Sequence, residues 1–165
     1  MSELVHLHPV VFTLRDVVTG CGFIAGIIVT GKAVMEQEDG KWWMYGVCPG
    51  GLAGSGPTLN EAFIDFRNRY REALFDIAED CKGFLQFQAA VKDFYSEDKE
   101  EGNRWDDALA TLRKSEQCVA EPFKGMLRKK PHEYDLGIQI DRLDNLSKAE
   151  LKPTTNIPDV LAKAA

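Results

Sequence analysis

The chain has 165 residues, of which 44% are hydrophobic and 28% charged, and its formal net charge is −6. This length suffices for one well-buried core, and the composition is ordinary for a soluble globular protein. The acidic balance argues against general nucleic-acid binding, because proteins that bind polyanions usually carry a basic excess. An acidic chain suits a small basic protein partner instead, through complementary charge.

Cysteine and histidine usage predicts no metal site and no cofactor. The cysteines are scattered without a C-x-x-C pair, and His6 and His8 are distant in sequence from His132. Zinc sites need clustered ligands at characteristic spacings, so we expect reduced, structural cysteines. The first residues lack the pattern of a signal peptide, and the longest apolar run, residues 23–29, is too short to span a membrane. We therefore expect a cytoplasmic protein.

The first third of the chain predicts three strands. Residues 4–15 form the first, placed at a sheet edge because Pro9 cannot donate to a ladder. Residues 16–22 form a turn, and a long β segment starts at Gly22. Asp39-Gly40, between apolar runs, predicts a type I′ hairpin turn because both residues tolerate positive φ.

The second strand of this hairpin carries large apolar side chains on both faces. Trp43 and Tyr45 point to one face, whereas Trp42 and Met44 point to the other. The chain's own later segments could cover Trp42 and Met44. The alternative is a subunit contact through these two residues, in a homo-oligomer.

A long helix is predicted from Leu59, with Thr58 and Glu61 as its capping box and Gly83 as its stop. We expect Ile64 and Phe75, on the back of this helix, to be partly covered as well. One arc of about 120° collects the apolar positions Leu59, Ala62, Phe63, Phe66, Tyr70, Ala73, Leu74, Ile77 and Cys81.

Two further helices and a short strand follow. Residues 84–95 carry a second apolar stripe, residues 96–103 form a charged loop, and the third helix spans about 104–117. Residues 136–141 alternate apolar with small or polar residues, as a strand does.

The fold class is therefore α+β, with an antiparallel sheet of three to five strands packed against one long helix, and two further helices. We divide the chain into residues 1–120 and a strand and tail at 121–165, packed on the same domain. A small basic patch consists of Lys124, Arg128, Lys129 and Lys130.

Few residues suggest chemistry. The glycine-rich residues 50–56 precede a helix N-terminus, where phosphates often bind, but the Gly-Lys-Ser/Thr of a nucleotide-binding loop is missing. Residues 50–56 are better explained as a compact connection that carries a short edge strand into the helix. No Ser-His-Asp or Cys-His set and no converging carboxylates are found, so we expect no enzyme.

The stretch of residues 33–78 resembles the N-terminal domain of HicB-family antitoxins. A hairpin closed by Asp-Gly, an aromatic strand, a Pro-Gly step and a Thr-x-x-Glu helix start carry the resemblance. The matching residues are Asp39, Gly40, Trp43, Pro49, Gly50, Gly56, Thr58, Leu59, Glu61 and Ala62. The resemblance implies a partial ribonuclease H-like fold without catalytic acids. Family members bind and neutralise HicA, a small basic RNA-cleaving toxin. Many also carry a C-terminal DNA-binding motif, for which we find no pattern after Glu121.

The resemblance implies a non-enzymatic regulatory protein of antitoxin type that occludes a small basic partner. We expect the binding surface to be acidic, comprising Asp65, Glu72, Asp76, Glu79 and Asp80. Three alternatives stay open: a small-ligand or nucleotide-binding protein using residues 50–56, a solitary HicB-like domain in another role, and a nuclease.

Overall fold

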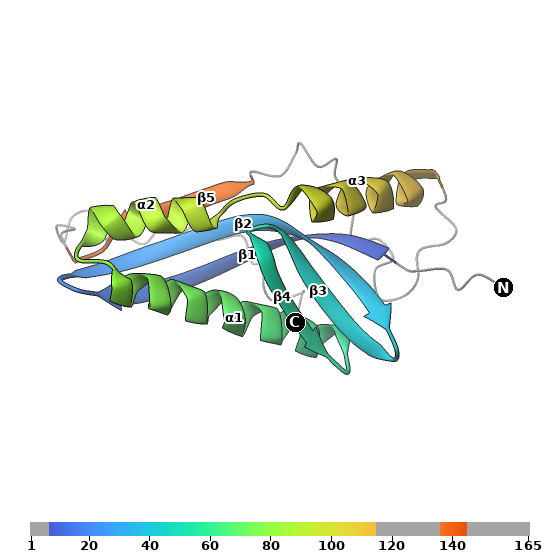
Figure 1. Ribbon diagram of the computed structural model, residues 1–165, viewed down its shortest axis with the longest axis horizontal. Coiled ribbons are helices and arrows are strands. Elements are labelled where there is room, and N and C mark those ends of the chain that lie inside the picture. The colour runs from blue at the N-terminus through green and yellow to red at the C-terminus, as the bar shows by residue number, and fades with distance from the viewer. Residues whose placement is uncertain (1–6, 115–135, 145–165) are drawn as a thin grey trace, which may run out of the picture.

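The computed structural model describes residues 7–114 and 136–144. They form an antiparallel sheet of five strands with three helices (Figure 1), which confirms the predicted α+β class. The strands are β1 (Leu7–Gly20), β2 (Phe23–Glu38), β3 (Lys41–Cys48), β4 (Gly50–Gly56) and β5 (Gly137–Arg142). The helices are α1 (Leu59–Asp80), α2 (Phe84–Phe94) and α3 (Lys99–Lys114).

Strand β2 is the centre of the sheet because it pairs with three others. On one side it pairs with β1 along 14 residue pairs, from Leu7↔Glu36 to Gly20↔Phe23. On its other side the first half of β2 pairs with β5 and the second half with β3, which in turn pairs with β4. The strand predicted near residue 136 therefore belongs to the same sheet as the N-terminal strands.

Strand β1 lies at an edge, as Pro9 indicated, but it is longer than predicted. The turn expected at residues 16–22 is shorter than predicted, since residues 16–20 belong to β1 and only Cys21 and Gly22 separate β1 from β2, with Gly22 at φ +75°. Asp16 is accommodated within the strand because Arg71 of α1 donates to its Oδ1 over 2.9 Å. The second hairpin is confirmed, with Asp39 and Gly40 at φ 49° and 74°.

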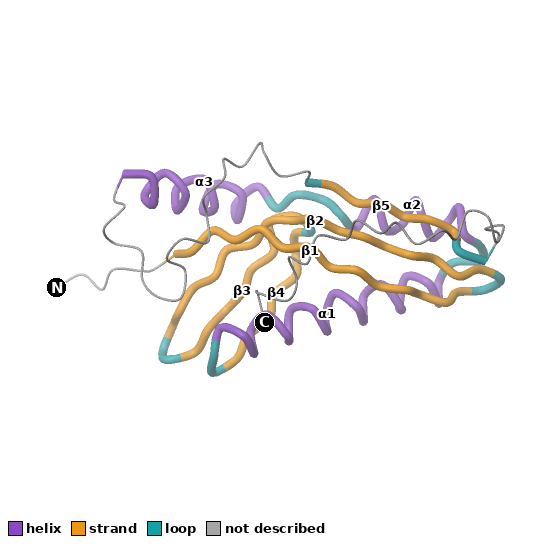
Figure 2. The backbone as a smooth tube through the Cα atoms, turned by 180° about the vertical axis from the view of Figure 1, so that it is seen from behind, coloured by secondary structure: helices purple, strands orange, loops and turns teal. Residues whose placement is uncertain are grey.

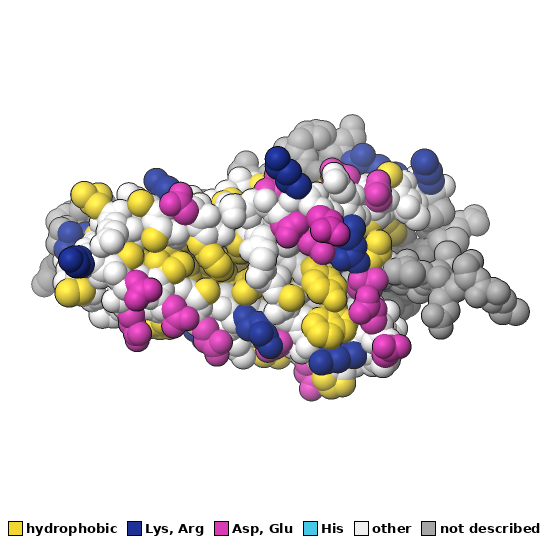
Figure 3. Space-filling view, in the orientation of Figure 1, with side chains coloured by type: hydrophobic (Ala, Val, Ile, Leu, Met, Phe, Trp, Pro, Cys, Tyr) yellow, Lys and Arg dark blue, Asp and Glu magenta, His cyan; other side chains and the backbone are white. Residues whose placement is uncertain are grey.

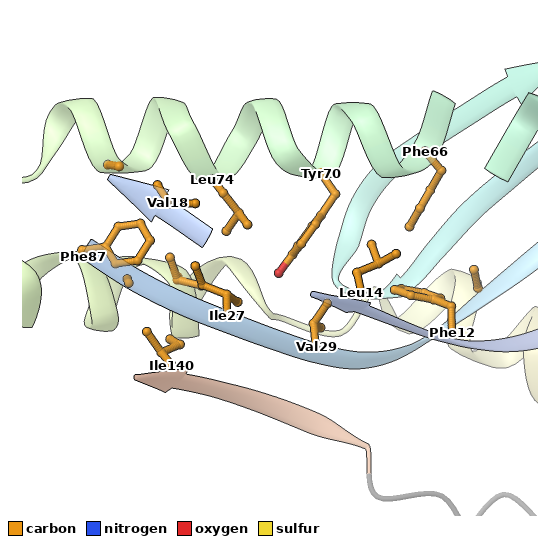
Figure 4. Packing of buried hydrophobic residues seen from close by; sticks show 14 of the residues in the cluster. Phe12, Leu14, Val18, Ile27, Val29, Phe66, Tyr70, Leu74, Phe87 and Ile140 are labelled. Atoms are coloured by element: carbon orange, nitrogen blue, oxygen red, sulfur yellow. The ribbon is translucent and has the colours of Figure 1, made fainter. Parts of the chain in front are cut away.

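Helix α1 covers one face of the sheet. It starts at the predicted capping box, in which Thr58 and Glu61 each bond the other's backbone N–H. Figure 4 shows Phe66, Tyr70 and Leu74 reaching from α1 toward the side chains of β1 and β2. Helix α2 packs on the same face, since its Phe87 and Val91 join this core cluster.

The back of α1 differs from the prediction. Ile64 and Phe75 are 46% and 42% exposed, so nothing in the described part of the chain covers them well. Burying large apolar side chains is favourable, and two of them on the outer surface of one helix are therefore informative.

Helix α3 covers the opposite face of the sheet at its β3 end. Trp105 and Leu109 form a second cluster with Val34 and Val47. The helix starts earlier than predicted, inside the expected charged loop, because the Asp98 carboxylate accepts the Glu101 N–H over 3.1 Å and caps it.

The remaining predictions lie outside the described residues. These are the basic patch, the end of the third helix beyond Lys114, and the C-terminal tail.

Candidate partner-binding surfaces

The five carboxylates expected to bind a partner all lie on α1, but Asp65 differs from the rest. Its Oδ2 accepts the Ser55 N–H over 2.9 Å and an Arg69 guanidinium N–H over 3.1 Å. The bond from the Ser55 backbone, with a further contribution from Arg69, lowers the pKa of Asp65. Asp65 therefore links β4 to α1 by a hydrogen bond, and its negative charge is paired with Arg69 within the fold.

The other four, Glu72, Asp76, Glu79 and Asp80, are exposed along the C-terminal half of α1. Figure 3 shows acidic side chains in a row along this helix. Within the described residues none of the four forms an ion pair. The last turn of α1 carries no basic residue, although negative charge is unfavourable at a helix C-terminus. This acidic face is not arranged for the stability of its own helix.

The two residues expected at a subunit contact lie on the α1 side of β3. Met44 is 0% exposed in the core, so the chain's own segments cover it and it cannot form a surface contact. Trp42 is half-buried and packs against the same core, with its ring centre 6.3 Å from that of His8. The expected contact through Met44 is wrong because α1 already occupies that face.

The opposite face of β3 carries a stacked row that the sequence did not predict. The rings of Trp43 and Tyr45 are nearly parallel, with centres 5.9 Å apart. Lys41 Nζ lies 4.8 Å from the Trp43 ring centre, and the Arg104 guanidinium lies 5.4 Å from that of Tyr45. Arg104 also bonds the carboxylates of Glu36 and Glu101. The alternation of Trp43 and Tyr45 was the only signal for this row, because nothing in the sequence connects α3 to β3.

Burial raises the pKa of Tyr45, and the negative charges of Glu38 and Glu36 raise it further. The carboxylates around the stacked row make it a poor site for a nucleic acid. Its cations are already engaged with rings and carboxylates. We therefore interpret the row as the attachment of α3 to the sheet.

The glycine-rich segment is strand β4, and α1 fills the space beside it. A Cβ atom at Gly54 would overlap the backbone of Phe66, and one at Gly56 would meet Glu61. The N-terminus of α1 is satisfied by its own capping box, which places the Glu61 carboxylate where a phosphate would have to approach. This geometry supports the connector interpretation and offers no phosphate cradle at Gly54 and Gly56.

The described residues hold no group of three or more His, Cys, Asp or Glu side chains that could bind a metal.

A hollow of about 270 Å³ lies on the sheet face opposite α1, lined by Arg15, Val17, Ile28, Asp141 and Leu143 among others. The described residues that line it include no nucleophile paired with a base. Among the described helices, none combines the length and hydropathy needed to cross a bilayer.

Comparisons with protein-family models, with curated proteins and with solved structures found no match to this chain.

Proposed function

We propose that this chain is a HicB-like regulatory protein of antitoxin type, which binds and neutralises a small basic RNA-cleaving toxin in the cytoplasm. It acts by occlusion of its partner and not by catalysis. The resemblance of residues 33–78 supports the family. The observation that carries the proposal is the acidic face formed by Glu72, Asp76, Glu79 and Asp80.

This acidic face suits a basic protein for two reasons. Its carboxylates are exposed and form no ion pairs within the described residues, so they are available to an incoming cation. They also lie on a helix held rigidly on the sheet by Phe66, Tyr70 and Leu74, which keeps their spacing constant. Surface charge of one sign steers a partner of opposite sign and improves specificity.

The test uses the small basic protein encoded beside the gene of this chain in its native host. Binding is measured by calorimetry, and neutralisation by growth of cells that produce both proteins. We expect the triple variant Glu72→Lys/Asp76→Lys/Glu79→Lys to bind at least about tenfold more weakly, because it reverses the field that attracts the partner. Affinity of the wild type should fall as salt increases.

The matched control is Asp93→Lys/Asp106→Lys/Asp107→Lys on α2 and α3, which changes the net charge equally at exposed positions. It should retain binding. All three positions are exposed, and a lysine at position 79 is favourable in the last turn of α1, so we expect the first variant to fold. The proposal fails if the gene has no neighbour of this kind, if the neighbour does not bind, or if both triple variants bind equally.

A further inference from the structure

The backbone groups at the sheet edges are satisfied unequally. An edge strand has N–H and C=O groups that no neighbouring strand can bond, and buried or shielded ones need other partners. On β4 the Ser55 N–H donates to Asp65, and the Gly50 N–H donates to the Ser96 carbonyl over 2.8 Å. On β5 the Ile140 carbonyl accepts Gln88 Nε2 over 3.4 Å. Side chains or loops thus bond part of each of these edges.

Strand β1 has such protection only near its start. There the Val10 carbonyl accepts the Trp105 indole N–H over 3.3 Å. From Thr13 to Gly20 its backbone bonds only to β2 within the part of the chain that the structure describes. The register with β2 is continuous, without the bulge that commonly disrupts an edge. At the middle of this free edge Val17 is 63% exposed.

The adjacent side of α1 carries two exposed apolar side chains, Ile64 and Phe75. Figures 1 and 2 show β1 and α1 running side by side, and Arg71 reaches from α1 to Asp16 of β1. Ile64 lies seven residues before Arg71 and Phe75 four residues after it, so helical spacing places all three on one side of α1. Ile64 and Phe75, both exposed, therefore lie on the side of α1 toward the β1 edge, where Val17 is also exposed but on the sheet face opposite α1.

We propose that the β1 edge binds a second copy of the chain, with the two β1 strands pairing antiparallel about a two-fold axis at Val17. This register places Val17 opposite Val17 of the second copy and Arg15 opposite Thr19. An axis at Arg15 would instead oppose two guanidinium groups, which is unfavourable. The pairing bonds the free edge groups of both copies into one continuous sheet and brings the Ile64 and Phe75 sides of the two α1 helices together.

This inference goes beyond the proposed function and does not depend on it. The axis lies at the β1 edge, whereas the acidic face is formed by other positions of α1. A dimer would therefore present that face twice. An extended peptide of another protein could add to the same edge, but the self-complementary register about Val17 favours a second copy.

A cross-linking experiment tests the register. In a Cys21→Ser/Cys118→Ser background, Val17→Cys should form a disulfide-linked dimer under mild oxidation. Directly opposed Cα atoms in an antiparallel pair lie roughly 4.5–5.5 Å apart, within the range of a disulfide. Thr19→Cys in the same background should not link, because its two copies would be about 14 Å apart along the strands. Equal or better linking through Thr19→Cys overturns the proposed register.

The oligomeric state tests the interface itself by light scattering during gel filtration. The wild type should be a dimer, and Val17→Lys should dissociate at least about tenfold more readily, since an outward lysine is a natural protection against edge pairing. The control is Ile24→Lys. Ile24 is exposed on the same sheet face but on the interior strand β2, opposite Thr19, so its variant should stay dimeric. A monomeric wild type, or a Val17→Lys dimer of unchanged stability, overturns the proposal.

Discussion

Asp65 shows how a single contact changes the role of a residue. The sequence places it among the surface carboxylates of α1, and its spacing is no different from theirs. In the structure its Oδ2 accepts a hydrogen bond from the Ser55 N–H, a backbone group at the edge of β4. The carboxylate is thus part of the fold, and only Glu72, Asp76, Glu79 and Asp80 remain available to a partner.

The pH dependence of stability should reveal this role. The pKa of Asp65 is lower in the folded chain than its unfolded value of about 3.9, so its stabilisation is present above about pH 4 and is lost as pH falls through the folded pKa. Asp65→Asn should therefore lower the free energy of unfolding by about 1 kcal/mol at pH 7, with a smaller difference from wild type at pH 3. Thermal unfolding across this pH range measures the effect.

Asp76→Asn is the matched control, because Asp76 is exposed and forms no ion pair within the described residues. It should leave the melting temperature unchanged. A difference between wild type and Asp65→Asn that is the same at pH 3 and pH 7 would contradict the assigned role.

At the scale of elements, β4 and α1 depend on each other. Gly54 lies so close to α1 that a Cβ atom would overlap the Phe66 backbone nitrogen and approach the Ala62 carbonyl. Backbone atoms cannot move aside as a flexible side chain can. The glycines of this segment therefore serve close packing of a strand on a helix, not ligand binding.

Gly54→Ala should destabilise the protein by about 1–3 kcal/mol, because the added methyl group forces β4 away from α1. This corresponds to a loss of several degrees in the melting temperature of a chain of this size. Gly137→Ala is the control, since no atom of the described residues lies within 4 Å of a Cβ built there. If the two variants are equally stable, the close contact is not what requires glycine at position 54.

The sequence predicted the elements better than their ends. The Asp39-Gly40 turn and the Thr58–Glu61 box are local signals, and both are confirmed. Two boundaries failed for different reasons. Asp16 looks like a turn residue, and the sequence cannot show that Arg71, 55 residues away, bonds it. Asp98 looks like part of a charged loop, but it caps α3 through the Glu101 N–H three residues later, a local signal that the prediction missed.

At the scale of the molecule, the sheet is covered differently along its length. Near β3 it is enclosed on both faces, which explains why the consecutive residues Ala33, Val34, Met35 and Glu36 are all buried. The same arrangement explains the apolar side chains on both faces of β3. The sequence indicated that both faces needed cover but could not show that α1 covers Met44, because that depends on tertiary packing.

We expect helix α3, which covers one face of the sheet, to unfold independently of the rest of the chain. Trp105 is 1% exposed and forms the centre of the cluster with Val34, Val47 and Leu109. Trp105→Ala should cost about 3–5 kcal/mol and release α3 first. Hydrogen exchange should then accelerate in α3 while α1 stays protected. Uniform acceleration throughout the described part of the chain would show that α3 is not an independent unit.

The binding surfaces were only partly predictable at this scale. The acidic residues of α1 are evident from helical spacing, and Pro9 indicates that β1 is an edge strand, but the sequence does not show that this edge is free. It emerges only when the partners of every edge are known, because β4 and β5 are also edge strands and differ from β1 in the groups that bond them.

The central position of β2 has a consequence for how the chain is made. Its first half pairs with β5, which follows it by about 110 residues, so this part of the sheet closes a very long loop. During synthesis, one side of β2 between Ala25 and Thr30 stays unpaired until residues 137–142 have left the ribosome. The hairpins and α1 can assemble early from nearby residues, whereas the last strand of the sheet is the slow, topologically distant step.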